Sequence, residues 1–291
     1  MISKAKHILI PTDFSDSSKN ALKHAAYIAN QLEARLTLLH IIDPPFNFPT
    51  NVEGVIDYLK ENAEQHLEEM VNLIEKKYPE KKFQIKTQIR IGKPISQITE
   101  ATSDLNIDLV VIGSGMDNPA RKVLFGSVST DVILRSPKPV LAVPSNVTSI
   151  NFNRILFTTN FRNGDLKNLE EVGRFARLFG SSIHILHVAK DDNLETEIKF
   201  RGMKELVQEK SIYDDVQFEM RRDPDAFSGI SDFVLNNDVS VMVMNRYRKS
   251  IVGLLLDKSY AKRMSIYSTV PLLVMIGEKG PVEAKLAKET I

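Results

Sequence analysis

Three short segments of the chain carry residues that favour binding of a phosphorylated ligand. Gly113-Ser114-Gly115 follows an apolar run, and Gly126-Ser127 comes directly before a helical pattern. Glycine lets a backbone approach phosphate oxygens closely, and the N-terminus of a helix favours anions. Asp13 follows another apolar run and can accept hydrogen bonds from a ribose hydroxyl or a base amine. These residue types together predict a nucleotide site.

Further donors stand close to these segments, but an ordinary explanation also exists. Ser127 and Ser129 supply hydroxyl groups, and the backbone N–H at Ile41 is placed to read an adenine edge. Any strand-to-helix connection can carry an aspartate cap and a glycine turn, however. Neither G-x-x-x-x-G-K-[ST] nor G-x-G-x-x-G occurs in the chain. The local pattern alone is therefore compatible with two interpretations: a ligand site, or residues that only cap a helix and form a turn.

The elements that would position these residues alternate between strand and helix. Continuous apolar runs at 7–11, 35–42, 108–113 and 139–144 are typical of strands buried on both faces, whereas 83–91 alternates and suits a more exposed strand. Helical periodicity covers 21–32 and 56–74, and further helices are expected from Pro94 and around Val128–Val132. The order βαβαβαβαβ predicts a parallel sheet between helices. In such sheets ligands bind beyond the carboxyl ends of the strands, where the turns after the first and fourth strands should converge.

The chain contains this arrangement twice. The segment HILIPTDF at 7–14 resembles RILFTTNF at 154–161, and LTLLHII at 36–42 resembles IHILHVA at 183–189. His40 therefore matches His187, and Asp13 matches Asn160, at one constant separation. A polar stretch at 145–153 joins the copies. We expect a first domain at 1–147, a second at 152–277 and a C-terminal tail at 278–291.

Composition excludes several classes of function. The 291 residues carry a formal net charge of +1, so no basic field favours nucleic acid. Cysteine is absent, which removes disulfides, thiolate metal sites and a cysteine nucleophile. The apolar run near the N-terminus is too short for a signal peptide, and no run approaches the ~18 apolar residues of a membrane span. We therefore expect a cytoplasmic protein without a membrane partner.

The segments at 8–43 and 125–144, with the glycine-rich loop between them, resemble the universal stress protein family. The likeness covers nearly all of the first half, and the second half keeps the same frame, so the whole chain resembles a tandem universal stress protein. The resemblance implies two flavodoxin-like or Rossmann-like α/β sandwiches, each with a five-stranded parallel sheet of order 3-2-1-4-5. It also implies that the two copies pair through their last strands as an intramolecular pseudo-dimer, and that chains can form a homodimer.

Nucleotide-binding members of this family carry the pattern G-x2-G-x9-G-[ST]. Gly113 fits the first glycine, Gly126 and Ser127 fit the last pair, and Met116 replaces the middle glycine. The resemblance places the following residues around the nucleotide: Pro11, Thr12, Asp13 and Ile41 near base and ribose, and Ile112, Gly113, Met116, Gly126, Ser127, Val128 and Ser129 near ribose and phosphates. The second copy departs from this set, with Asn160, Asn245 and Lys258 in place of Asp13, Gly113 and Gly126. We expect the first copy to bind and the second to be degenerate.

The favoured function is a stress-response regulatory protein that binds ATP or AMP in its first domain, with Mg²⁺ as a companion of ATP. The alternative is an interaction or scaffold module that binds no nucleotide. A slow ATPase is less favoured, because no second carboxylate pairs with Asp13 and the S-G-G-x-D-S and H-I-G-H turns are absent. No catalytic residue and no protein metal site is assigned. His40 and His187 are expected to bond to backbone carbonyls rather than to a metal.

Overall fold

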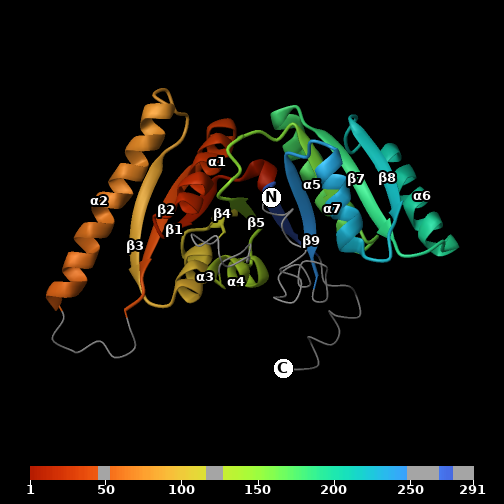
Figure 1. Ribbon diagram of the computed structural model, residues 1–291. Coiled ribbons are helices and arrows are strands. Elements are labelled where there is room, and N and C mark those ends of the chain that lie inside the picture. Colours follow the sequence, from red (N-terminus) through yellow and green to blue (C-terminus); the bar gives the residue numbers. More distant parts are fainter. Residues whose placement is uncertain (45–52, 116–126, 248–268, 278–291) are drawn as a thin grey trace. The chain divides into compact units, whose positions relative to one another are not determined.

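The computed structural model describes residues 1–44, 53–115, 127–247 and 269–277 (Figure 1). The chain divides into two compact units, Ser3–Ile150 and Asn151–Ile291, and the boundary falls in the polar stretch between the two sequence repeats. Within the described ranges, no helix has the length and apolar character needed to cross a membrane. Each unit is an α/β structure in which strands and helices alternate.

The first unit builds one parallel sheet in the strand order β3-β2-β1-β4-β5, which confirms the predicted order. Its strands are β1 (His7–Thr12), β2 (Arg35–Ile42), β3 (Ile85–Ile91), β4 (Leu109–Ser114) and β5 (Val140–Pro144). Its helices are α1 (Asp16–Leu32), α2 (Glu53–Lys77), α3 (Pro94–Asp104) and α4 (Ser127–Arg135), and a short 3-10 turn, η1 (Ile2–Lys4), precedes β1.

The second unit repeats this topology in the order β10-β9-β6-β7-β8, again with parallel neighbours. Its strands are β6 (Arg154–Thr158), β7 (Ser182–Ala189), β8 (Val216–Arg222), β9 (Val241–Arg246) and β10 (Leu272–Ile276). Its described helices are α5 (Asn163–Phe179), α6 (Leu194–Glu209) and α7 (Ala226–Asn236). β6 therefore corresponds to β1 and β9 to β4, as the sequence repeat requires.

Burial in the first sheet follows the predicted patterns. Every residue of β1 and of β5 is buried, whereas the alternating strand β3 lies at the sheet edge and is half exposed. Helix α1 packs against β1, β4 and β5, and α2 packs against β2 and β3; α3 and α4 pack against each other on the opposite face. Ser15 caps α1 by accepting a hydrogen bond from the Ser18 N–H, and Pro94 begins α3.

The topology creates one position suited to a ligand in each sheet. From β1 the chain moves outward to β2 and β3, then returns through α3 to β4 on the other side of β1. The connections after β1 and β4 leave the sheet in opposite directions, so a crevice opens between them at the carboxyl ends of these strands. The same reasoning applies to β6 and β9 in the second unit.

Candidate functional site

A cavity of about 290 Å³ lies at the carboxyl ends of β1, β2 and β4 in the first unit. The turn after β1, the first turn of α1, the ends of β2 and β4, and the starts of α3 and α4 all contribute to its wall. The lining residues are Pro11, Thr12, Asp13, Ser17, Ser18, His40, Ile41, Pro94, Ile98, Ile112, Gly113, Gly115, Ser127, Val128 and Ser129. This is the crevice that the strand order predicts.

The structure brings together every predicted site residue that it describes. These are Pro11, Thr12, Asp13, Ile41, Ile112, Gly113, Ser127, Val128 and Ser129, which come from four separate stretches of the sequence. The two other predicted residues, Met116 and Gly126, lie outside the described residues. The geometry therefore joins the nine described residues of the predicted set in one cavity, and the ligand that the cavity binds stays a prediction.

Sequence reasoning missed six lining residues. Ser17, Ser18, His40, Pro94, Ile98 and Gly115 also face the cavity. A helix that starts at Pro94 was expected from the sequence, but the contact of its first turns with this cavity depends on the tertiary structure. A usable signal existed for Ser17 and Ser18, because the first turn of the helix that follows β1 must border any crevice at the end of β1.

The polar end of the cavity is organised around Asp13. Its Oδ1 atom accepts hydrogen bonds from the Ser15 backbone N–H at 3.1 Å and from the Ser15 hydroxyl at 2.5 Å. The Ser15 hydroxyl also lies 2.9 Å from the Ser17 hydroxyl. Because both bonds to Asp13 within the described chain go to Oδ1, Oδ2 is available to accept a hydrogen bond from a ligand. A carboxylate with one committed and one available oxygen suits a hydroxyl or amine donor.

A strained turn holds Asp13 in place. Phe14, the next residue, adopts φ 66°, a left-handed conformation that is unusual for a bulky side chain. Its N–H donates to the Thr12 hydroxyl at 3.0 Å, and its ring stacks on His40 with centroids 4.3 Å apart. His40 in turn donates from Nδ1 to the Thr12 carbonyl at 2.9 Å. A backbone conformation of this kind costs of order 1–3 kcal/mol, and it persists because the surrounding contacts stabilise it.

The second unit repeats this turn, which separates its structural role from ligand binding. Phe161 has φ 56°, its N–H donates to the Thr159 hydroxyl at 3.0 Å, and its ring lies 4.3 Å from that of His187. His187 donates from Nδ1 to the Thr159 carbonyl at 2.8 Å. Both histidines therefore bond to backbone carbonyls, as expected. Burial lowers the pKa of His187, although the bond to Thr159 and the charge of Asp165 partly oppose this shift.

Gly113 is required by packing against α1. A Cβ atom at this position would lie 2.5 Å from the Ser17 carbonyl carbon and 2.6 Å from the Ser18 backbone nitrogen. Real Cβ atoms do not approach backbone so closely, so β4 and the first turn of α1 can lie at this spacing only because residue 113 is a glycine. The sequence interpretation of Gly113, close approach to phosphate, thus omitted its contact with the protein's own helix. Gly115 has φ 137°, a conformation that side chains rarely adopt.

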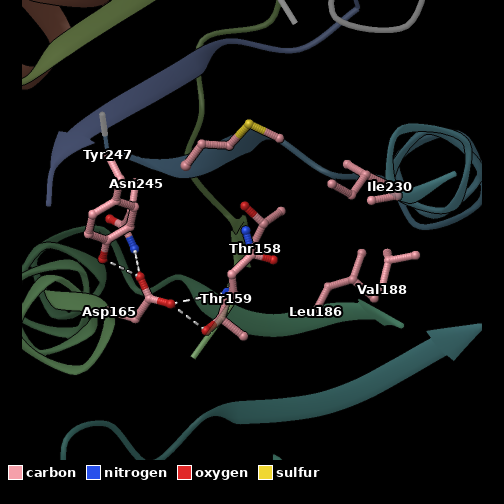
Figure 2. A pocket seen from close by; sticks show the side chains of 11 residues that line it. Thr158, Thr159, Asp165, Leu186, Val188, Ile230, Asn245 and Tyr247 are labelled. Atoms are coloured by element: carbon pink, nitrogen blue, oxygen red, sulfur yellow. Dashed lines mark hydrogen bonds between the residues drawn. The ribbon is translucent and has the colours of Figure 1, made fainter. Parts of the chain in front are cut away.

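The corresponding crevice of the second unit is almost filled. Its volume is about 20 Å³, and it is lined by Thr158, Thr159, Asn160, Asp165, Leu186, Val188, Ala226, Ile230, Met244, Asn245 and Tyr247 (Figure 2). Asn160 and Asn245 replace Asp13 and Gly113 there, whereas Lys258 and Ser259 lie outside the described residues. Asp165, which occupies the position of Ser18, and Tyr247, which occupies that of Gly115, were not foreseen from the sequence.

Among the described residues, no group of three or more histidine, aspartate or glutamate side chains is arranged to hold a metal ion. Among the described residues that line the first cavity, Asp13 supplies a carboxylate and His40 an imidazole. If Mg²⁺ accompanied ATP, Asp13 and the phosphates themselves are the groups that fit its preference for oxygen.

Comparison with known proteins agrees with this architecture. The model of the universal stress protein family matches residues 4–144. Universal stress protein MJ0577 of Methanocaldococcus jannaschii is 30% identical over 152 residues, which cover 47% of this chain and 94% of that protein. Universal stress protein MJ0531 of the same organism is 31% identical over 138 residues, covering 47% of this chain and 81% of that protein.

A solved structure also resembles the full length of the chain. The crystal structure of a universal stress protein from Archaeoglobus fulgidus aligns with a TM-score of 0.74 at 22% identity and covers 96% of this chain and 98% of that one. At this level of identity the likeness concerns the fold, and it extends over both units. The two relatives from Methanocaldococcus jannaschii, together with the match to the family model, show that this chain belongs to the universal stress protein family.

Proposed function

We propose that the first unit binds an adenine nucleotide, ATP or AMP, and that the chain is a stress-response regulatory protein that reports this nucleotide. The observation that carries the proposal is the single cavity in which Asp13, an apolar wall and the start of α4 meet. A nucleotide has a group to match each of these parts: a flat base for the apolar wall, a hydroxylated sugar for Asp13 and an anionic phosphate for the start of α4. Cytoplasmic location, the pairing of the two units and a homodimer stay predictions.

The apolar wall suits a purine. Pro11, Ile41, Pro94, Ile98 and Ile112 line the cavity, and Ile98 and Ile112 are almost fully buried. Ligand pockets of this kind are mainly apolar, with a few polar groups that fix orientation. The volume of about 290 Å³ lies just below the range of about 300–1,000 Å³ that is usual for small-molecule sites.

The anionic end of the ligand is best placed near α4. Ser127 is the first residue of this helix, and Ser127 and Ser129 both face the cavity. The backbone N–H groups and the positive dipole at the start of a helix favour phosphate. Two serine hydroxyls add donors to the same end.

Titration calorimetry of the full chain with ATP and with AMP tests this proposal. We expect binding of one adenine nucleotide per chain, and at 100 times the dissociation constant the ligand should add ~2.7 kcal/mol to the stability of the native state. GTP serves as the control for the base. If neither adenine nucleotide binds or shifts the melting temperature, the scaffold alternative replaces the proposal. If ATP binds and phosphate is released on long incubation, the protein is an ATPase.

Asp13→Asn is expected to weaken adenine-nucleotide binding by roughly ten- to a hundredfold, since a hydrogen bond to a charged group contributes ~1.5–3 kcal/mol. The second unit carries Asn160 at this position, so the fold tolerates the change. Asp16→Asn is the matched control, because Asp16 is an exposed carboxylate at the start of α1, three residues after Asp13, and lies outside the cavity lining. Equal affinities of the two variants in calorimetry would contradict the assigned role of Asp13.

A further inference from the structure

Asp165 is one of the residues that distinguish the filled crevice of the second unit from the open cavity of the first. It is the third residue of α5, and Ser18 is the third residue of α1. Both side chains are 2% exposed and both line the crevice of their own unit. The two crevices therefore differ at one helix position by the exchange of a hydroxyl for a carboxylate.

The Asp165 carboxylate accepts hydrogen bonds from donors in two segments, the turn after β6 and the end of β9. Oδ2 accepts hydrogen bonds from the Thr159 hydroxyl at 2.7 Å and from the Asn160 and Arg162 N–H groups at 3.1 Å each. Oδ1 accepts from the Asn245 amide and the Tyr247 hydroxyl, each at 2.6 Å (Figure 2). A buried carboxylate is stable only when its oxygens are paired in this way. The five bonds tie the turn after β6 to the end of β9.

Ser18 makes no such connection among the described residues. Its hydroxyl accepts from the Thr12 hydroxyl at 3.0 Å and donates to the Ser15 carbonyl at 2.9 Å, so it stays within its own turn. The end of β4 presents Gly113 and Gly115, which have no side chain to place in the crevice. The same region thus remains open at about 290 Å³ in one unit and is reduced to about 20 Å³ in the other.

Tyr247 is fixed independently of its bond to Asp165. The Arg162 guanidinium lies 4.7 Å from the centre of its ring, and Gly277 approaches so closely that a Cβ there would meet the ring at 2.1 Å. Asn245 is held as well, since its Oδ1 accepts from the Asn168 amide at 2.7 Å. The donors that reach Asp165 are therefore held by their own neighbours.

We propose that Asp165 is an internal occupant of the second crevice. Its carboxylate takes the place of a ligand, satisfies the donors around it and holds the second unit closed, so that the chain offers one nucleotide site and not two. The residue at this helix position decides whether a unit is open or closed. The count of one site rests on the proposed function, whereas the closing role of the carboxylate does not.

Hydrogen exchange followed by NMR on the full chain tests the closing role without any nucleotide. In Asp165→Ser, the backbone amides of Asn160 and Arg162 are expected to exchange about tenfold faster or more, because each loses its acceptor. Asp232→Ser, which changes an exposed aspartate of α7 in the same unit, should leave both rates unchanged. Unchanged rates in Asp165→Ser would overturn the proposal.

Tyr247→Phe keeps the experiment decisive if Asp165→Ser fails to fold. It removes one donor to Oδ1 and leaves the ring against Arg162 and Gly277. We expect a folded protein in which the Asn160 and Arg162 amides exchange several-fold faster, since the carboxylate is less firmly held. Exchange at the wild-type rates would show that the carboxylate does not organise the closed crevice.

The reciprocal variant Ser18→Asp tests the same position in the first unit. We expect it to reduce adenine-nucleotide affinity at least tenfold in calorimetry, while Ser103→Asp, an exposed site on α3, retains wild-type affinity. Wild-type affinity in Ser18→Asp would contradict the proposal. If the wild-type chain binds no nucleotide, the proposed function fails on its own, and the exchange rates at Asn160 and Arg162 still decide the role of Asp165.

Discussion

Replacing Gly113 with alanine is expected to destabilise the first unit by roughly 2–3 kcal/mol, because the added methyl group would overlap backbone atoms of α1. The atoms concerned are the Ser17 carbonyl group and the Ser18 nitrogen, at 2.5–2.6 Å. Backbone at the start of a helix cannot rotate away as a side chain can, so β4 and α1 must separate. Urea unfolding monitored by circular dichroism measures the loss.

The matched control is Gly54→Ala in the same unit. Gly54 lies in the first turn of α2, and a Cβ there would meet nothing within 4 Å. Alanine is the better helix former by up to about 1 kcal/mol, so this variant should be slightly more stable than the wild type. Equal effects of the two substitutions would show that the contact between β4 and α1 is looser than the distances indicate.

Gly113→Ala should also impair the cavity. Gly113, Ser17 and Ser18 all belong to its wall, so a separation of β4 from α1 changes its shape directly. We expect adenine-nucleotide affinity to fall together with stability in this variant, whereas Gly54→Ala keeps wild-type affinity in the same calorimetric titration. A stable Gly113→Ala protein with wild-type affinity would contradict this account of the site.

Mild acidification is expected to destabilise the protein. Burial lowers the pKa of His7, His24 and His187 from the ordinary value of 6.5. The folded state therefore favours the neutral imidazoles, and below pH 6.5 the unfolded state binds more protons. The stability contribution is fully present above pH 6.5 and is lost as the pH falls through the lower pKa values of the folded state.

The size of this loss of stability follows from the number of protons that the unfolded state binds in excess of the folded state. Each additional proton bound by the unfolded state changes the free energy of unfolding by about 1.4 kcal/mol per pH unit, so three histidines give at most roughly 4 kcal/mol per unit. His7 shows the cost structurally, since its Nδ1 donates to the Leu105 carbonyl and its Nε2 accepts from the Thr37 hydroxyl. Protonation of Nε2 destroys that acceptor.

Urea unfolding between pH 8 and pH 5.5 measures the effect above the range in which most carboxylates titrate. We expect a flat free energy of unfolding at the alkaline end and a decline below pH 6.5. His24 is fully buried, and burial lowers its pKa. Because His24→Gln removes this titrating group, the free energy of unfolding should decline less steeply with falling pH in this variant. A stability that is constant or increases toward pH 5.5 would contradict the assignment.

Much of the fold was predictable because its signals are local. Continuous apolar runs mark the buried strands, the alternating segment at 83–91 contains the half-exposed edge strand β3, and Pro94 marks the start of α3. Strand order came from the family resemblance, and the sheets confirm it in both units. The convergence of Asp13, Ile41 and Gly113 also followed, since the ends of parallel strands meet at one edge of the sheet.

The alternation of elements, the duplication and the crevice at which polar residues gather can therefore be derived from the order of residues in the chain. The content of each crevice depends on how distant segments pack. Asp165 has the sequence signature of an ordinary acidic residue in a first helical turn, and the donors Asn245 and Tyr247 stand about eighty residues away. Local pattern records which side chains a segment carries, whereas the closing of a crevice depends on distances between segments that meet only after packing.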